Sequence, residues 1–234
     1  MSASDRPSIL IAGASRGLGQ AMAAEFLKKG WRVVGTVRDA TAHTPLHDLL
    51  DGAGDRLEIE TLDIAAAEQI AALRERLAGR RLDMLFVNAG TTTPDQLALV
   101  SEVSDAEFVR VMLTNGLGPI RVIEALQDLV PASGLIGVMS SGQGSIANNL
   151  SGQREVYRAS KAALNMMMRS LAARPGEARA MAVVAPGWVR TDLGGPQGRL
   201  SIEESVPSLV EVLLAKLDRP GLEYLDYQGR TVPW

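Results

Sequence analysis

The chain of 234 residues contains no cysteine, and this absence excludes several kinds of site. Disulfide bonds, thiolate metal ligands and thiol nucleophiles all require that residue. Histidine is scarce as well, with only His43 and His47 in the chain. The two share i,i+4 spacing, but a metal site usually needs three or four ligands and no third ligand is evident nearby. We therefore interpret both as solvated loop residues and predict no metal site.

Long hydrophobic runs and a large excess of one charge are also absent. No apolar run approaches the roughly 20 residues that a membrane-spanning helix needs. The formal net charge of −3 gives no electrostatic reason to expect binding to nucleic acid or to an anionic membrane. Residues 1–7 are polar and lack the apolar segment of a signal peptide. We expect a cytoplasmic protein without a nucleic-acid or membrane partner.

Short apolar runs alternate with longer segments of helical periodicity through most of the chain. The predicted strands are residues 8–12, 32–37, 57–62, 84–88, 135–140, 180–185 and 222–225, and the predicted helices are 19–29, 65–77, 105–129, 156–173 and 202–217. Strands that alternate with helices indicate βαβ units on a parallel sheet covered on both faces. Without a linker to divide it, the chain is predicted to be one domain over residues 1–234. The expected fold class is α/β, a doubly wound Rossmann-type fold with about seven strands.

A glycine-rich turn follows the first predicted strand. Residues 9–19 read Ile-Leu-Ile-Ala-Gly-Ala-Ser-Arg-Gly-Leu-Gly, with the spacing Gly-x-x-x-Gly-x-Gly. Glycines let the main chain turn tightly and approach a pyrophosphate, which then rests on the helix N-terminus. An ordinary strand-to-helix turn is the alternative interpretation. The expected dinucleotide contacts in this turn are Gly13, Ser15, Arg16, Gly17, Leu18 and Gly19.

The end of the second predicted strand indicates which dinucleotide is bound. An acidic residue there would bind the ribose 2′-hydroxyl, whereas an arginine accommodates a 2′-phosphate. The chain has Val37 followed by Arg38 and Asp39, and Arg16 in the glycine turn is a candidate for a second clamp. Because arginine suits bidentate contact with phosphate, we expect NADP(H) as the cofactor. The alternative is a solvated Arg38–Asp39 pair.

The other predicted strands also end in polar or small residues. Asp63 follows the third strand, where a carboxylate could accept a hydrogen bond from an adenine amino group, and small residues after the fourth let the main chain approach a ligand. Trp188 is expected to floor a substrate pocket or, alternatively, simply to pack, and Trp234 is expected to pack on a neighbouring element or subunit. The expected cofactor contacts in these segments are Asp63, Ile64, Asn88, Ala89, Gly90, Pro186, Gly187, Val189 and Thr191.

Tyr157 and Lys161 are four residues apart in a predicted helix, which places a phenol beside an ammonium group. A free tyrosine titrates near pH 10, and a cation within about 4–6 Å lowers that pKa by favouring the phenolate. Lowering the tyrosine pKa from about 10 to neutral pH takes a shift of roughly three units, which is more than one lysine normally supplies. The pair points to proton transfer at a hydroxyl or carbonyl oxygen. The alternative is a surface helix with a packed tyrosine and a solvated lysine.

Taken together, the glycine turn, the Asn88-Ala89-Gly90 element and the Tyr157/Lys161 pair resemble the short-chain dehydrogenase/reductase family over nearly the whole chain. The closer likeness is to its C-factor and sniffer type, which are carbonyl-reductase-like. The resemblance implies that Tyr157 is the general acid/base and that Ser141 hydrogen-bonds the substrate oxygen. It also implies that Lys161 lowers the pKa of Tyr157 and binds the nicotinamide ribose, and that Asn115 holds a relay water. Val189 and Thr191 would hold the carboxamide.

The chain departs from the family pattern at three places. Ala12 replaces the usual threonine before the first glycine, which removes a hydroxyl that could tie the turn to the Asn88 segment and is expected to loosen the site. The interval from Ser141 to Tyr157 is a few residues longer than usual, with the extra length near residues 148–152. Ser141 is chosen over Ser140 from its place before Gly142. The expected substrate lid, residues 191–205, is short and polar.

We therefore expect an NADPH-dependent oxidoreductase that interconverts a small carbonyl compound and its alcohol through Asn115, Ser141, Tyr157 and Lys161. The alternative is a cofactor-binding sensor or signalling protein of the same fold with little turnover. A sugar-nucleotide epimerase is disfavoured because the chain lacks the length for an extra substrate domain. The resemblance also implies a homodimer or homotetramer, for which the apolar helix 156–173 is a candidate interface. It does not identify the substrate.

Overall fold

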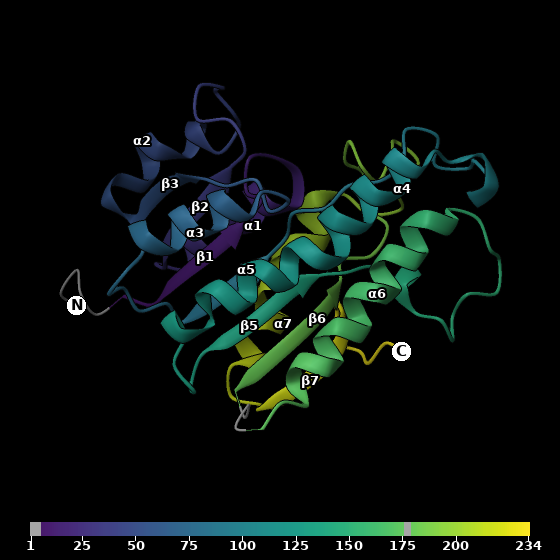
Figure 1. Ribbon diagram of the computed structural model, residues 1–234. Helices are drawn as coiled ribbons and strands as arrows, with labels where there is room; N and C mark the ends of the chain where they lie inside the picture. The colour runs from purple at the N-terminus through teal and green to yellow at the C-terminus, as the bar shows by residue number, and fades with distance from the viewer. Residues whose placement is uncertain (1–5, 176–178) are drawn as a thin grey trace.

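Seven parallel strands form one sheet in the order β3-β2-β1-β4-β5-β6-β7 (Figure 1). The computed structural model describes residues 6–175 and 179–234, so the polar residues 1–5 lie outside the described part. The strands are β1 (Ser8–Ala12), β2 (Arg32–Val37), β3 (Leu57–Thr61), β4 (Met84–Val87), β5 (Leu135–Met139), β6 (Ala180–Ala185) and β7 (Gly221–Asp226). The predicted doubly wound α/β fold is confirmed, with strand ends that differ from the predicted ones by at most one residue.

Helices cover both faces of the sheet. They are α1 (Gly17–Lys28), α2 (Leu50–Ala53), α3 (Ala67–Arg76), α4 (Asp105–Met112), α5 (Gly118–Leu126), α6 (Glu155–Ala172) and α7 (Ile202–Lys216). Helices α3, α5 and α6 pack on one face, and α1 and α7 pack on the other (Figure 1). The prediction missed α2 because a single helical turn is too short to show periodicity. No helix in the described part of the chain is both long and apolar enough to span a membrane.

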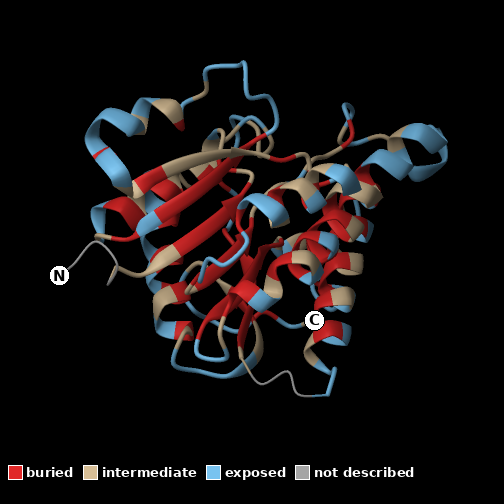
Figure 2. Ribbon diagram, turned by 60° about the vertical axis from the view of Figure 1, so that its left-hand side comes forward, coloured by how far each residue is buried: buried red, intermediate tan, exposed pale blue. Residues whose placement is uncertain are grey.

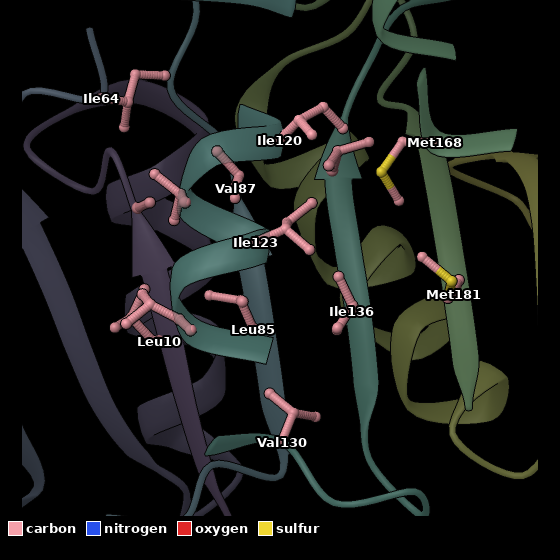
Figure 3. Close-up of a cluster of buried hydrophobic side chains, with 14 of the residues drawn as sticks. Leu10, Ile64, Leu85, Val87, Ile120, Ile123, Val130, Ile136, Met168 and Met181 are labelled. Carbon is pink, nitrogen blue, oxygen red and sulfur yellow. The ribbon is translucent and has the colours of Figure 1, made fainter. Parts of the chain in front are cut away.

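The strands divide the core into two layers because successive side chains point to opposite faces of a sheet. Leu10 and Leu85 belong to the layer under α3, α5 and α6, together with Ile123 from α5 (Figure 3). Ile9 and Phe86 belong to the layer under α1 and α7. The inner strands are therefore buried on both faces, as Figure 2 shows, which explains why they appear in the sequence as continuous apolar runs, whereas the edge strand β3 is mostly half-buried.

The long helix predicted over residues 105–129 is not continuous. The structure has α4, then a π-helical turn over Leu113–Leu117, then α5 and a final 3₁₀ turn over Gln127–Leu129. Gly118 allows the close packing at the start of α5, since a Cβ atom there would lie 2.7 Å from the main-chain oxygen of Ile64. π-Helical turns are rare in proteins, and those that occur are often found at functional sites. This one contains Asn115.

The strand order reverses between β1 and β4. β1 pairs with β2 on one side and with β4 on the other, both in parallel register. In open α/β sheets, ligands bind beyond the carboxyl ends of the strands at such a switch point. This topology brings the glycine turn after β1 and the Asn88 segment after β4 to one crevice.

The end of the chain packs against α6 and β7. The Trp234 ring lies 5.1 Å from the ring of Tyr224 and 4.9 Å from the guanidinium carbon of Arg169. Its main-chain oxygen accepts a hydrogen bond of 3.1 Å from the Ala147 amide. The expectation that Trp234 packs on a neighbouring element is confirmed, and the contact anchors the loop that follows β5.

We predict that Lys216→Met lowers the free energy of unfolding by about 2 kcal/mol, because it removes the charged hydrogen bonds that a buried ammonium group donates. The fully buried ammonium group donates to the main-chain oxygens of Arg219 and Gly221, the latter at 2.7 Å, and lies 3.0 Å from Glu223. Urea unfolding measures the loss. Arg219→Met is the control, because its half-exposed side chain also pairs with Glu223 and should cost less than about 1 kcal/mol. Equal losses would contradict the prediction.

Candidate active site

A cavity of about 1310 Å³ lies at the carboxyl edge of the sheet. This volume exceeds the usual range for small-ligand pockets and is large enough for a dinucleotide together with a substrate. The predicted site residues that line it are Gly13, Ser15, Arg16, Gly17, Leu18, Arg38, Asp63, Ile64, Asn88, Ala89, Gly90, Ser141, Tyr157, Lys161, Pro186, Gly187, Val189 and Thr191. Gly19 and Asn115 do not line the cavity. The topology thus gathers segments from six strand ends into one place.

The glycine turn approaches the end of β4 as closely as main-chain atoms allow. Gly13 has φ +89°, and a Cβ atom there would lie 2.7 Å from the Cα of Ala89. Thr36 on β2 supports the turn, since its hydroxyl accepts a hydrogen bond of 2.9 Å from the Gly13 amide. Gly19 lies beneath the turn, where a Cβ atom would meet the main-chain oxygen of Gly13 at 2.1 Å. Gly13 and Gly19 therefore shape the cradle rather than merely allowing flexibility.

Hydrogen bonds connect the glycine turn to the segment after β4, although position 12 lacks a threonine hydroxyl. The main-chain oxygen of Ala12 accepts hydrogen bonds of 2.9 Å from the amides of both Asn88 and Ala89. The Asn88 side chain then donates to the main-chain oxygen of Gly13 at 2.7 Å. These hydrogen bonds hold the turn and the β4 exit together without a hydroxyl at position 12.

At the far end of the cavity, Arg38 is exposed and is not paired with its neighbour Asp39. The Asp39 carboxylate accepts instead from the amide and the hydroxyl of Thr41, at 2.9 and 2.7 Å, and these hydrogen bonds lower its pKa. The solvated Arg38–Asp39 pair is therefore not formed. Arg16 does have an acidic partner, with its Nε 3.2 Å from the Asp192 carboxylate across the cavity mouth.

Helix α6 brings Tyr157 and Lys161 into the cavity, and both are buried. The ammonium group of Lys161 donates to the main-chain oxygen of Met139 at 2.8 Å, and it lies 5.9 Å from the centre of the Tyr157 ring. Burial lowers the pKa of Lys161 to about 8, since the low-dielectric surroundings disfavour its charge. Lys161 is therefore still mostly protonated at neutral pH.

The pKa of Tyr157 differs from the sequence-based expectation. Burial raises it, while the charge of Arg154 and a hydrogen bond with the Ser141 side chain act in the opposite direction. The guanidinium carbon of Arg154 lies 4.7 Å from the centre of the Tyr157 ring, closer than the ammonium group of Lys161. Sequence reasoning missed Arg154, which precedes α6 as its N-cap residue and lies outside the predicted helix 156–173.

The two serines after β5 have different surroundings. Ser140 is buried, and its hydroxyl donates to the side chain of Asn165 at 2.6 Å. The Ser141 hydroxyl accepts from the Gln143 amide at 3.1 Å, and its residue is held by Tyr224, whose hydroxyl donates to the Ser141 main-chain oxygen. This geometry favours Ser141 as the group facing Tyr157. Tyr224 comes from β7 and carries no local sequence signal that links it to the site.

Asn115 is fully buried behind the cavity wall. Its side-chain oxygen accepts from the Thr91 amide at 2.8 Å. Its amino group donates to the main-chain oxygen of Thr91 at 2.8 Å and to the hydroxyl of Ser160 at 2.9 Å. Both N–H groups of the side chain are thus engaged within the protein, and the residue fixes the segment after β4 against α6.

The segment after β6 folds over the cavity mouth. The Arg190 amide donates to the main-chain oxygen of Leu200 at 2.9 Å, which folds residues 188–200 into a compact loop. Trp188 lines the cavity with 46% of its surface exposed, and its indole N–H donates to the oxygen of Gly194 at 2.8 Å. The Thr191 hydroxyl accepts from the Gly194 amide at 3.0 Å.

Metal chemistry finds no support in this geometry. Within residues 6–175 and 179–234, no group of three or more acidic or histidine side chains is placed to hold a metal ion. His43 instead lies 2.6 Å from the Asp48 carboxylate on the exposed surface. The ionisable groups that line the cavity include the phenol of Tyr157, the ammonium group of Lys161 and several guanidinium groups, together with the carboxylates of Asp63, Asp192 and Asp226. The arrangement is suited to binding anionic groups and to moving a proton.

Comparison with known proteins places this geometry in context. Residues 7–199 match the family model of the short chain dehydrogenases. C-signal of Myxococcus xanthus is 36% identical over 157 residues, which cover 65% of this chain and 93% of C-signal. A Burkholderia multivorans crystal structure, described as a short-chain dehydrogenase/reductase with bound NADP, is 65% identical with a TM-score of 0.95, covering 98% of this chain and 100% of that one.

A further solved structure is a carbonyl reductase from Pseudomonas aeruginosa PAO1 in complex with NADP. It is 35% identical, with a TM-score of 0.90 and coverage of 98% of this chain and 100% of that chain. The family-model match extends over the glycine turn, the β4 exit and the Tyr157/Lys161 helix, so the resemblance drawn from the motifs is confirmed. The chain belongs to the short-chain dehydrogenase family.

Proposed function

We propose that this protein is an NADP(H)-dependent reductase that interconverts a small carbonyl compound and its alcohol. The observation that carries the proposal is the convergence of Tyr157, Ser141 and Lys161 in the cavity that also contains the glycine turn. The NADP-bound structure at 65% identity and the NADP-bound carbonyl reductase at 35% identity support the cofactor and the reaction class. The homodimer or homotetramer implied by the resemblance stays a prediction.

The cavity fits a dinucleotide phosphate on the evidence of its own residues. Gly13 and Gly19 allow the turn to pack against the β4 exit and against itself, because a Cβ atom at either position would clash with main-chain atoms, and the turn ends at the N-terminus of α1. This is the arrangement that binds pyrophosphate, because main-chain N–H groups and the helix dipole favour negative charge. Arg38 offers to the 2′-phosphate a guanidinium that is not paired with Asp39, and Lys161 would hold the nicotinamide ribose. The bound cofactor supplies the hydride for the carbonyl carbon.

The raised pKa of Tyr157 suits reduction of a carbonyl group. A group whose pKa lies above its ordinary value stays protonated at pH 7, so Tyr157 is set up as a proton donor. The Ser141 hydroxyl, which already hydrogen-bonds with Tyr157, would hold the same carbonyl oxygen. Alignment of the reacting groups can contribute about 7–11 kcal/mol to the acceleration.

Asn115 would act in the proton relay through its main chain. Its side-chain N–H groups are both engaged, whereas hydrogen bonds in a π-helical turn run to i+5 and redirect main-chain carbonyl groups. A relay water held by this carbonyl would connect to Lys161. The Lys161 ammonium group and the Asn115 side-chain oxygen would lie 3.3 and 3.4 Å from a Cβ atom placed on Gly90. The proton that leaves Tyr157 would be replaced along this path.

A cofactor sensor with little turnover is the second candidate, favoured by the similarity to a protein named C-signal. A sensor needs the dinucleotide cradle but not a buried phenol that hydrogen-bonds with a serine. The presence of this acid–base pair is why we favour catalysis. NADPH binding without turnover across a broad panel of carbonyl compounds would reverse the choice.

We predict that Tyr157→Phe reduces kcat by at least about 10³-fold, since it removes the proton donor and leaves the ring in place. The dissociation constant for NADPH, measured by fluorescence titration, should change by less than about threefold. Retained turnover in this variant would show that another group donates the proton.

A second prediction concerns cofactor choice. Arg38→Ala should weaken NADPH binding by about tenfold or more, because a charged hydrogen bond to phosphate contributes roughly 1.5–3 kcal/mol. NADH has no 2′-phosphate, so its weaker binding should not change. Calorimetric titration of both cofactors measures the effect, with Asp39→Ala as the control that alters the neighbouring charge. An equal loss for NADH would assign Arg38 a merely structural role.

The third prediction follows from the pKa of Lys161. The group is protonated below about pH 8 and loses its charge as the pH rises through that value. NADPH affinity should therefore fall between pH 7 and pH 9, by up to about tenfold if only the charged form binds. Lys161→Met should bind more weakly and without this dependence. A wild-type affinity that is flat over this range would contradict the proposed ribose contact.

A further inference from the structure

The cavity contains buried polar atoms without hydrogen-bond partners in the protein. Among the described residues these atoms are Oγ1 of Thr92, Oε1 of Gln143, and both Nε and Nη2 of Arg154. Buried polar groups are normally paired, and each unpaired one requires an explanation. Those of Arg154 carry a charge, so their desolvation is the most costly. Burial accordingly lowers the pKa of Arg154.

The surroundings of Arg154 leave its charge uncompensated. The neighbouring carboxylate of Glu155 is turned away and accepts from the Val100 amide at 2.8 Å. Arg158 is turned away as well, with its guanidinium bonded to Gln153 and Ser151. The aromatic face of Tyr157 is the contact that Arg154 does make, with 4.7 Å between the guanidinium carbon and the ring centre. This cation–π contact uses the face of the guanidinium and leaves Nε and Nη2 without a hydrogen-bond partner among the described residues.

The main chain is strained to hold Arg154 in this position. Gln153 has φ 59° and Arg154 has φ 52°, both in the left-handed region that side chains disfavour. Each such residue costs of order 1–3 kcal/mol, and strain of this kind clusters at ligand sites. The strained pair, Gln153 and Arg154, directly follows the segment 148–152, which lengthens the interval between Ser141 and Tyr157. The extra length thus delivers a guanidinium to the cavity beside the proposed proton donor.

We propose that the substrate is a short oxo acid whose carboxylate binds Arg154 while its carbonyl oxygen binds Tyr157 and Ser141. A guanidinium fork matches a carboxylate in a bidentate manner. Because Arg154 lies over the ring whose hydroxyl meets the carbonyl, a few carbons at most separate the two substrate groups, as in 2-, 3- and 4-oxo acids. The inference rests on the proposed function: the carbonyl is reduced to the hydroxy acid and the carboxylate is unchanged.

The kinetic test compares each acid with its methyl ester, which keeps the carbonyl and removes the charge. For 2-oxobutanoate, 3-oxobutanoate and 4-oxopentanoate, wild-type kcat/KM should exceed that of the ester for at least one chain length by tenfold or more. In Arg154→Met the acid-to-ester ratio for that substrate should fall by about 10–100-fold, as expected for loss of charged hydrogen bonds. Arg154→Lys keeps the charge but lacks the guanidinium fork, so its acid-to-ester ratio should lie between those of the wild type and Arg154→Met.

Arg121→Met is the matched control, because Arg121 is exposed on α5 and does not line the cavity. Its acid-to-ester ratio should equal that of the wild type. An equal loss for acid and ester in Arg154→Met would overturn the inference and leave Arg154 as a group that merely adjusts Tyr157. A thermal midpoint lowered by several degrees in Arg154→Met would also count against it, since a ligand group that is unpaired in the protein should not be needed for folding.

Binding separates this inference from the proposed function. Calorimetric titration of the NADP⁺-loaded protein with 2-, 3- and 4-hydroxy acids should show binding of the product with the preferred length, lost in Arg154→Met. Binding without turnover of any carbonyl would support the anion site and refute the reductase. Turnover of neutral carbonyls, with neither acid preference nor hydroxy-acid binding, would refute the inference and leave the reductase standing.

Discussion

The close approach between Gly13 and Ala89, at the carboxyl ends of β1 and β4, is the constraint on which the rest of the site depends. A side chain at Gly13 would force the two strand ends apart, because its Cβ atom would lie 2.7 Å from the Cα of Ala89. The approach allows Ala12 to bond two amides at once and Asn88 to reach the Gly13 oxygen. The positions of the segment after β4, of Asn115 behind it and of α6 beyond follow from this contact.

Burial is the second influence on the site, and it shifts the pKa values of Tyr157 and Lys161 in opposite directions. The same low-dielectric surroundings keep the phenol protonated and make the ammonium group easier to deprotonate. Both side chains lie on α6, on the same helix face as Leu164 and Met168, which pack in the apolar layer further along the helix. The stability of the helix and the acidity of the site are therefore set by the same packing.

The sequence was sufficient to predict the parts of this architecture that depend on local pattern. The strands read as continuous apolar runs, and the glycine turn and the Tyr157/Lys161 spacing have geometric consequences that do not depend on distant residues. What sequence could not give were contacts across the fold, such as Tyr224 from β7 holding the Ser141 carbonyl, or Thr36 supporting Gly13. The π-helical turn at Asn115 was missed because one added residue per turn hardly disturbs helical periodicity. Arg154 could not be placed by helical spacing either, because its left-handed conformation just before α6 sets its position against Tyr157.

The ties between Ala12, Asn88 and the glycine turn have a kinetic consequence. These hydrogen bonds are made entirely within the protein, so the cradle keeps its shape without help from a ligand. A preformed site loses little conformational entropy when it is filled. Association with the dinucleotide would then need no slow rearrangement of the cradle, and its rate would be governed by diffusion and by the attraction between guanidinium groups at the cavity mouth and the incoming phosphates.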